Sequence, residues 1–355
     1  MPKRIHWKHE LQDIFNQHND RAAKKDKTVS YRTRQARAEL LFNCIREVYE
    51  LGYKLQSVRS LGGRHVQALV DHWVAQKLGP GTIQQKLSVL RTFCSWIGKD
   101  GMVLEPRHYV PDAALVTRRY IPIKDKSWTS NQVDPQTVLS RVNKISPVIA
   151  LALEAEWLFG LRRRESLMLK PNRADQGPYL IIDSSDGPKN GRSRVVPVDT
   201  PVKRDYLDRV SAYVKFKETR LGELLTDRNG KQLTLEQAVK RFQNVMTKTG
   251  ITQSGLGVTP HGLRHQYAND KYRQLTGQDS PVRGGQIELP LDGHDARQQV
   301  SRELGHERVG ITSAYLGGLR GYLQRRRLGE EKKVAGVAAS GGETHSGTGH
   351  NVPTD

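Results

Sequence analysis

The stretch HGLRHQY, residues 261–267, begins an expected helix in the second half of the chain. Residues three and four apart share one face of a helix, so His261 lies beside both Arg264 and His265. Two histidines at this spacing are similar to half of a zinc site, but Gly262 stands where the metalloprotease motif requires a glutamate. The stretch therefore predicts an imidazole and a guanidinium on one helix face, and we expect no metal ion there.

Three other stretches in the same half of the chain carry reactive or charged side chains. They are GLRRRES with Arg162 and Glu165, GPKNGRSR with Lys189, and LGHERVGITSAYLG with His306 and Tyr315. Taken alone, each has an ordinary explanation: a surface ion pair on a helix, a solvated lysine in a turn, and the half-buried ring of a short helix. Their order and spacing along the chain indicate one shared site.

These residue types suit attack on a phosphodiester without a metal ion. Guanidiniums stay protonated and offer planar forks of donors that hold a phosphate. A histidine can take the proton of a nucleophile, and a lysine on a turn can protonate the departing 5′ oxygen. Further imidazole donors can stabilise the charge that develops in the transition state. The sequence has no obvious cluster of acidic metal ligands, which most metal-dependent nucleases would need.

The pattern G-L-R-x-x-E, a hairpin lysine, H-x-L-R-H, L-G-H and a tyrosine nine residues later resembles the signature of the tyrosine recombinases, or phage integrase family. The resemblance covers roughly residues 30–325 and implies a role for each residue. Arg162 and Arg264 would clamp the scissile phosphate, Lys189 would be the general acid, His261 the general base or a donor, His306 a donor to the phosphate, and Tyr315 the nucleophile that forms a 3′-phosphotyrosyl link. Glu165 and His265 would support the site without reacting.

The same resemblance implies a fold that is mainly α with a small β-sheet. It predicts an N-terminal helical core-binding bundle of the SAM-like type, followed by an α+β catalytic domain. The two domains would form a C-shaped clamp on double-stranded DNA and act as a homotetramer that exchanges strands between two specific sites through a Holliday junction. No cofactor is expected, because the phosphotyrosine link conserves the bond energy. Accessory directionality or DNA-bending proteins are possible further partners.

The composition agrees with a nucleic-acid partner. The chain of 355 residues has a formal net charge of +20, which favours a polyanion. No apolar run approaches the roughly 20 residues of a membrane span, and no signal peptide is evident, so we expect no membrane partner and a bacterial cytoplasmic protein that joins the nucleoid when it acts. Cys44 and Cys94 lie on apolar helix faces and are expected in the core without a disulfide.

Hydrophobic periodicity divides the chain into parts. Apolar residues at three- and four-residue steps predict four helices over 6–98, within a DNA-binding domain at 1–118. A stretch rich in Gly, Pro and basic residues is expected to form a linker at 119–133. The catalytic domain is expected at 134–328, and the small, polar residues 329–355 are expected to be a disordered tail.

The polar face of the fourth expected helix carries the predicted DNA-binding residues. They are Gln84, Ser88, Arg91 and Ser95, with Arg34 of the second helix added. Long polar and basic side chains on a helix can reach phosphates and base edges, although a solvated surface is an equally ordinary use of such residues.

Two readings besides an integrase of a mobile element stay open. A type IB topoisomerase would use the same chemistry as a monomer on one duplex, and a DNA-binding protein of the same fold would have no use for a nucleophile. The interval from Arg264 to His306 is longer than the family usually has, because of a loop at 277–297 rich in Gly, Pro and polar residues. We expect that loop to be a surface excursion.

Overall fold

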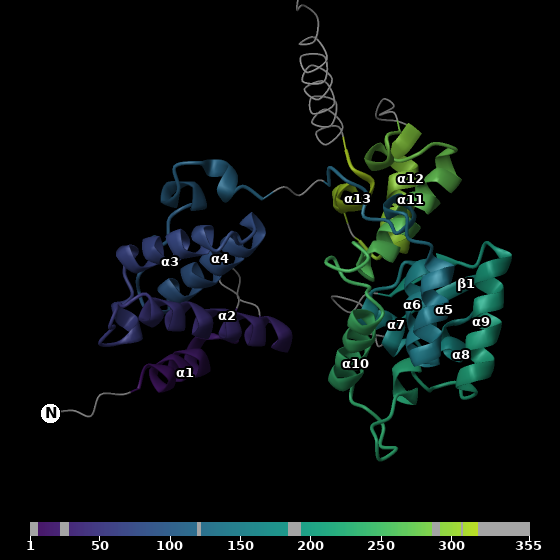
Figure 1. Ribbon diagram of the computed structural model, residues 1–355, viewed down its shortest axis with the longest axis horizontal. Helices are drawn as coiled ribbons and strands as arrows, with labels where there is room; N and C mark the ends of the chain where they lie inside the picture. The colour runs from purple at the N-terminus through teal and green to yellow at the C-terminus, as the bar shows by residue number, and fades with distance from the viewer. Residues whose placement is uncertain are drawn as a thin grey trace, which may run out of the picture. The chain divides into compact units, whose positions relative to one another are not determined.

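The computed structural model describes residues 6–21, 28–118, 122–183, 193–285, 292–306 and 308–318. The chain divides into two compact units, Met1–Arg119 and Tyr120–Asp355 (Figure 1). Both are built mainly from helices, and the second also contains a two-stranded sheet, which confirms the predicted fold class. None of the described helices combines the length and the apolar composition needed to cross a bilayer.

The first unit contains the four helices predicted over 6–98. They are α1 (Trp7–His18), α2 (Tyr31–Glu50), α3 (Gly63–Ala75) and α4 (Pro80–Trp96), with short 3-10 turns at Val58–Ser60, Pro106–Tyr109 and Ala113–Leu115. Trp73 is wholly buried at their centre, and its indole donates to Glu47, which also pairs with the largely buried Lys86 at 2.8 Å. Cys44 and Cys94 are buried, and burial raises the pKa of both thiols to about 12, so both are inert core residues.

The second unit is assembled around α6. Its helices are α5 (Pro135–Ile145), α6 (Pro147–Phe159), α7 (Arg163–Met168), α8 (Pro171–Ala174), α9 (Pro201–Val214), α10 (Leu235–Lys248), α11 (His261–Thr276), α12 (Asp292–Glu303) and α13 (Val309–Leu316). Short 3-10 turns lie at Thr129–Asn131, Leu221–Leu224 and Pro281–Arg283. Strands β1 (Tyr179–Ile182) and β2 (Arg194–Pro197) pair antiparallel, with Tyr179 opposite Pro197.

Helix α6 carries the site because of how it ends. It is apolar and buried on nearly every side, and α5 and α11 pack against it. Gly160 terminates the helix with φ +60, and a Cβ atom there would lie 2.6 Å from the Tyr267 ring of α11. Only glycine fits this left-handed, crowded position, and the turn that it makes delivers Arg162 to the start of α7.

The structure differs from the expected linker at 119–133. Trp128 is wholly buried in the core of the second unit, and its indole donates to the Thr259 carbonyl at 2.8 Å. A Cβ at Gly262 would lie 2.6 Å from the Lys126 carbonyl, so this segment packs directly on the first turn of α11. The basic and proline-rich composition predicted an exposed connection, but a single tryptophan anchors the segment. Lys189 and the expected tail at 329–355 lie outside the described residues.

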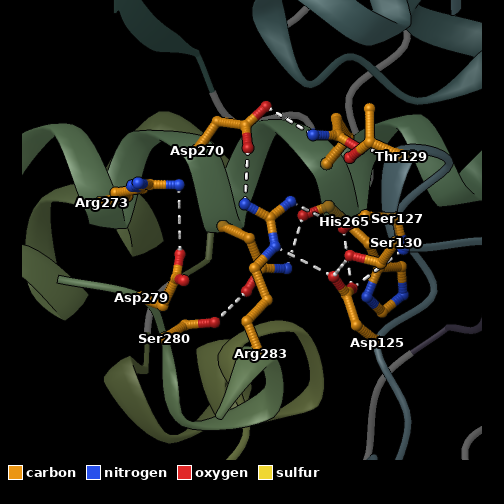
Figure 2. A network of polar contacts seen from close by, with 12 residues as sticks. Asp125, Ser127, Thr129, Ser130, His265, Asp270, Arg273, Asp279, Ser280 and Arg283 are labelled. Carbon is orange, nitrogen blue, oxygen red and sulfur yellow. Dashed lines mark hydrogen bonds and ion pairs between the residues drawn. The ribbon is translucent and has the colours of Figure 1, made fainter. Parts of the chain in front are cut away.

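The expected surface loop at 277–297 also differs in its described parts. Ser280, Pro281 and Val282 are buried, and α12 already begins at Asp292. Arg283 reaches across to the segment before Thr129 and bonds Asp125 at 3.0 Å, Ser127 at 3.2 Å and Asp270 of α11 at 2.7 Å (Figure 2). Arg283 is therefore paired with residues outside the loop, whereas Gln278, His294 and Asp295 are exposed as expected.

Candidate active site

Arg264 lies at the centre of the site and is wholly buried in α11. Its guanidinium donates to the carbonyls of Gly160 and Leu304, and its Nε lies 3.3 Å from the Tyr315 hydroxyl. The distance from its Nη2 to Nε2 of His306 is 3.0 Å. Burial lowers the pKa of Arg264 to about 10, so it remains a cation at neutral pH. One side chain thus joins the end of α6, the turn after α12 and helix α13.

Arg162 supplies a second guanidinium from the N-terminus of α7. Its Nη1 donates to Glu165 at 2.5 Å, its backbone N–H donates to the same carboxylate at 2.8 Å, and its Nη2 lies 3.4 Å from the Leu304 carbonyl. The side chain keeps 28% of its surface exposed, whereas Glu165 is wholly buried. Arg162 therefore keeps part of its side chain in contact with solvent, whereas Arg264 is wholly buried.

Three imidazoles surround the Tyr315 ring. The ring centroids of His265, His306 and His261 lie 4.7, 5.5 and 5.8 Å from that of Tyr315. Burial and the charge of Arg264 lower the pKa of His306 to about 3, and burial and the neighbouring His261 lower that of His265 to about 3. Desolvation and then the Arg264 charge lower the pKa of His261 to about 4, although the residue as a whole is partly accessible to solvent. All three rings are neutral at pH 7 and offer one donor and one acceptor each.

Tyr315 lies on α13 with 7% of its surface exposed. The helix packs against α11 and α12, and Asn269 of α11 donates to the Tyr315 carbonyl at 3.4 Å. The structure therefore gathers five of the six predicted catalytic residues from three separate stretches of the second unit: Arg264 and the three imidazoles lie next to Tyr315, and Arg162 shares the Leu304 carbonyl with Arg264. The sixth, Lys189, lies outside the described residues, five positions before the first residue of β2.

Sequence reasoning missed two buried charged residues here. Arg194, the first residue of β2, has a side chain that is 3% exposed and donates to Glu165 at 2.6 Å. Burial would raise the pKa of Glu165, but Arg194 and then Arg162 outweigh it and lower this pKa to about 2. The available signal was the alternation of β2, which turns Arg194 and Val196 inward and Val195 outward.

The second missed residue is Glu156, which lies on α6. It is 2% exposed, accepts from Ser166 at 3.4 Å and lines a cleft of about 540 Å³ together with Arg162 and His261. Burial raises the pKa of Glu156 to about 8, so the carboxyl is protonated and uncharged at neutral pH. The sequence did not reveal the burial of Glu156, because a glutamate within an apolar helix indicates only an interruption of a hydrophobic run.

The predicted DNA-binding residues of the first unit differ in their exposure and contacts. Ser88 and Ser95 are exposed on α4, as the periodicity indicates. Gln84 and Arg91 are partly exposed and also contact the following segment: Gln84 donates to the Val116 carbonyl at 2.7 Å, and Arg91 donates to the carbonyls of Val103 and Leu104. Arg34 is half-buried on α2, with its guanidinium 5.9 Å from the centre of the Tyr31 ring.

One guanidinium beside the Tyr315 hydroxyl, a second nearby on the Leu304 carbonyl, and three neutral imidazoles around the Tyr315 ring are suited to binding a phosphate and to accepting a phenolic proton. Among the described residues, no group of three or more His, Cys, Asp or Glu side chains is placed to hold a metal ion.

Comparison with known proteins places this site in a family. The family model described as "Phage integrase, N-terminal" matches residues 15–103, and the model described as "Integrase" matches residues 129–270. Tyrosine recombinase XerC of Lactobacillus delbrueckii subsp. bulgaricus is 25% identical over 68% of this chain and 73% of its own. XerC of Neisseria meningitidis serogroup B is 26% identical over 64% of this chain and 66% of its own.

Solved structures share the fold. A lambda integrase dimer bound to a COC′ core site matches with a TM-score of 0.54 and 14% identity over 88% of this chain and 78% of that one. The Tn1549 transposon integrase in complex with transposon right end DNA matches with a TM-score of 0.53 and 15% identity over 89% of this chain and 98% of that one. The chain belongs to the tyrosine recombinase (phage integrase) family, which confirms the family prediction and, with it, the prediction of an enzyme that breaks and rejoins DNA strands.

Proposed function

We propose that this protein is a site-specific recombinase of a mobile genetic element, which cleaves and rejoins double-stranded DNA through a 3′-phosphotyrosyl intermediate at Tyr315. The observation that carries the proposal is the 3.3 Å contact between the Tyr315 hydroxyl and Arg264, inside a ring of imidazoles. A tyrosine that only filled the core would not need a buried guanidinium beside its hydroxyl, with a second arginine on the same Leu304 carbonyl. Family membership supports the same chemistry.

In the cleavage step, the Tyr315 oxygen attacks the scissile phosphorus as the bond to the 5′ oxygen breaks. Arg162 and Arg264 hold the non-bridging oxygens and offset their charge. His261 accepts the phenolic proton; a bound phosphodiester adds negative charge beside the ring and raises its proton affinity above that of the free enzyme. His306 donates a hydrogen bond to the phosphate. Lys189 gives its proton to the departing 5′ oxygen, and attack by that hydroxyl on the phosphotyrosine reverses each transfer.

The DNA partner and the assembly follow from the same proposal. One matching structure is a lambda integrase tetramer bound to a Holliday junction, with a TM-score of 0.51 and 14% identity over 85% of this chain and 77% of that one. We propose a homotetramer on two specific duplex sites, aided by directionality or DNA-bending proteins, in the bacterial cytoplasm at the nucleoid. The net charge of +20 supports binding to the DNA backbone. In the first unit, the exposed Ser88 and Ser95 are the simplest direct contacts.

A nicked suicide substrate tests the nucleophile. The full chain should form a protein–DNA adduct that survives a denaturing gel, and peptide mapping should place the DNA on Tyr315. Tyr315→Phe should bind DNA and form no adduct, while Tyr272→Phe, which alters another buried tyrosine of this unit, should still form it. An adduct that persists in Tyr315→Phe would contradict the proposal. Relaxation of plasmids that lack any recombination site would favour a topoisomerase.

A second substrate tests Lys189. Lys189→Ala should cleave ordinary DNA slowly, because the 5′ oxygen leaves poorly without a proton. A 5′-bridging sulfur leaves as a thiolate without protonation, so the variant should cleave that substrate almost as fast as the wild type. Equal slowing on both substrates would exclude Lys189 as the general acid.

A further inference from the structure

One buried carboxylate is shared by two arginines at the edge of the site. Oε1 of Glu165 accepts from Arg162 at 2.5 Å, and Oε2 accepts from Arg194 at 2.6 Å and from the Arg162 backbone at 2.8 Å. Each oxygen thus has a guanidinium of its own. Arg162 therefore meets Glu165 through Nη1 alone, rather than through the two parallel bonds that an arginine and a carboxylate favour.

Arg194 is held in place by its surroundings. It starts β2 opposite Ile182, and its Cδ would lie 3.0 Å from a Cβ at Gly305, in the turn that precedes His306. Its Nε and Nη1 are buried and have no hydrogen-bond partner, so Glu165 is its only ionic contact among the described residues. A cation buried in this way is costly unless its single partner stays ionised.

We propose that Arg194 is a positioning residue for Arg162: it occupies Oε2 of Glu165 and so keeps part of the Arg162 fork available to the scissile phosphate. The inference rests on the proposed function. With Arg194 absent, a wholly buried carboxylate would have Arg162 as its one charged partner. The Arg162 guanidinium and the Glu165 carboxylate would then form a bidentate ion pair, and Arg162 would turn away from the DNA.

The geometry separates this role from direct catalysis. The unpaired nitrogens of Arg194 are shielded from solvent, whereas 28% of the Arg162 side chain is exposed. A phosphate arriving from solvent therefore meets Arg162 first. Arg194 acts from behind, through a carboxylate that both arginines contact.

A double-mutant cycle on the full chain tests the proposal. Four variants are compared for single-turnover adduct formation on saturating suicide substrate: Arg194→Gln, Arg194→Lys, Glu165→Gln and the Arg194→Gln/Glu165→Gln double variant. Arg194→Gln should slow the reaction about 100-fold, as loss of a transition-state donor does. The double variant should be faster than Arg194→Gln, because a neutral amide no longer captures Arg162. Arg194→Lys should recover part of the rate, since it keeps the charge.

The controls exclude a purely structural effect. DNA affinity and the melting temperature are measured for each variant, and Arg209→Gln, which breaks an arginine–glutamate pair between α9 and α6, should cleave like the wild type. If Arg194 only supported the fold, the double variant would be as slow as Arg194→Gln or slower, and that result would overturn the proposal. A wild-type rate in Arg194→Gln would also overturn it. Failure of the wild type to form an adduct would instead reject the proposed function.

Discussion

Two largely buried arginine networks contact helix α11, and they differ in the ratio of guanidiniums to carboxylates. We call the first the site network, which consists of Arg162, Arg194, Arg264 and Glu165. We call the second the Arg283 network, which consists of Arg283, Asp125, Asp270 and Ser127 (Figure 2). The site network has three guanidiniums and one carboxylate, whereas the Arg283 network has one guanidinium and two carboxylates.

The difference indicates that the Arg283 network serves stability and that the site network serves function. In the Arg283 network every charge has a partner: Arg283 contacts both carboxylates, and Asp125 also accepts from Ser127 and Ser130. Burial would raise the pKa of Asp125, but the hydroxyl groups, a backbone N–H and Arg283 outweigh it and lower this pKa. The site network has one carboxylate for three guanidiniums, so part of its positive charge has no counter-ion within the network. Such an excess is costly to fold and suits a site whose missing anion is a phosphate.

The largest expected effect comes from breaking the closed network. Arg283→Met should lower the free energy of unfolding by about 3–5 kcal/mol, because the largely buried Asp125 would lose its cation. At a temperature where the variant is folded, its cleavage rate should match the wild type. Denaturant unfolding and single-turnover cleavage measure the two effects. A stable variant that cleaves slowly would contradict the division of roles.

The opposite result is expected for Arg162→Ala. The activation free energy of cleavage should rise by about 3 kcal/mol, which is the usual scale for the loss of one transition-state donor. The free energy of unfolding should change by no more than about 1 kcal/mol, because the side chain is partly exposed and Glu165 keeps Arg194. Rates on the suicide substrate and a denaturant curve on the same preparation provide the comparison. A large loss of stability with unchanged chemistry would reverse the assignment.

The protonation state of Glu156 decides whether a second carboxylate adds negative charge next to the site network. Its folded pKa is about 8 against an ordinary 4.5, so between these values the folded state binds one more proton than the unfolded state. Stability should therefore fall as the pH rises from 4.5 towards 8, by at most about 1.4 kcal/mol per pH unit from this group. Glu156→Gln should flatten that slope, measured by unfolding at several pH values. An unchanged slope would mean that Glu156 is ionised and cancels part of the excess charge.

Local patterns in the sequence predicted the helices of the first unit and the separate motifs of the candidate site. The 3.6-residue period gives α1 to α4, and Asp134 followed by Pro135 marks the start of α5. Within a motif, the spacing places neighbouring candidates such as His261 and Arg264 on one helix face; that the separate motifs meet was implied by the resemblance to the tyrosine recombinases.

Contacts between distant segments could not be read in this way. Arg194 lies 29 positions from Glu165, and Arg283 lies 158 positions from Asp125. A charge in a Gly- and Pro-rich stretch has the same local pattern whether it is solvated or paired inside the protein. In the described parts of 119–133 and 277–297, the buried Trp128 and the paired Arg283 differ from the expected exposure for this reason, since each binds a partner that its own segment does not reveal.

The smallest expected effect lies where the two networks approach each other. Ser280, beside Arg283, donates to Asn269, whose amide donates to the carbonyls of His265 at 2.7 Å and Tyr315 at 3.4 Å. Ser280→Ala leaves the buried Asn269 oxygen without this donor and should lower the free energy of unfolding by about 1 kcal/mol. The exposed Ser140→Ala on α5 is the matched control. The Asn269 amide keeps its contact with the Tyr315 carbonyl, so the adduct should form at the wild-type rate. A slower rate at unchanged stability would show that the segment around Arg283 positions the nucleophile, and the contrast between the two networks would no longer hold.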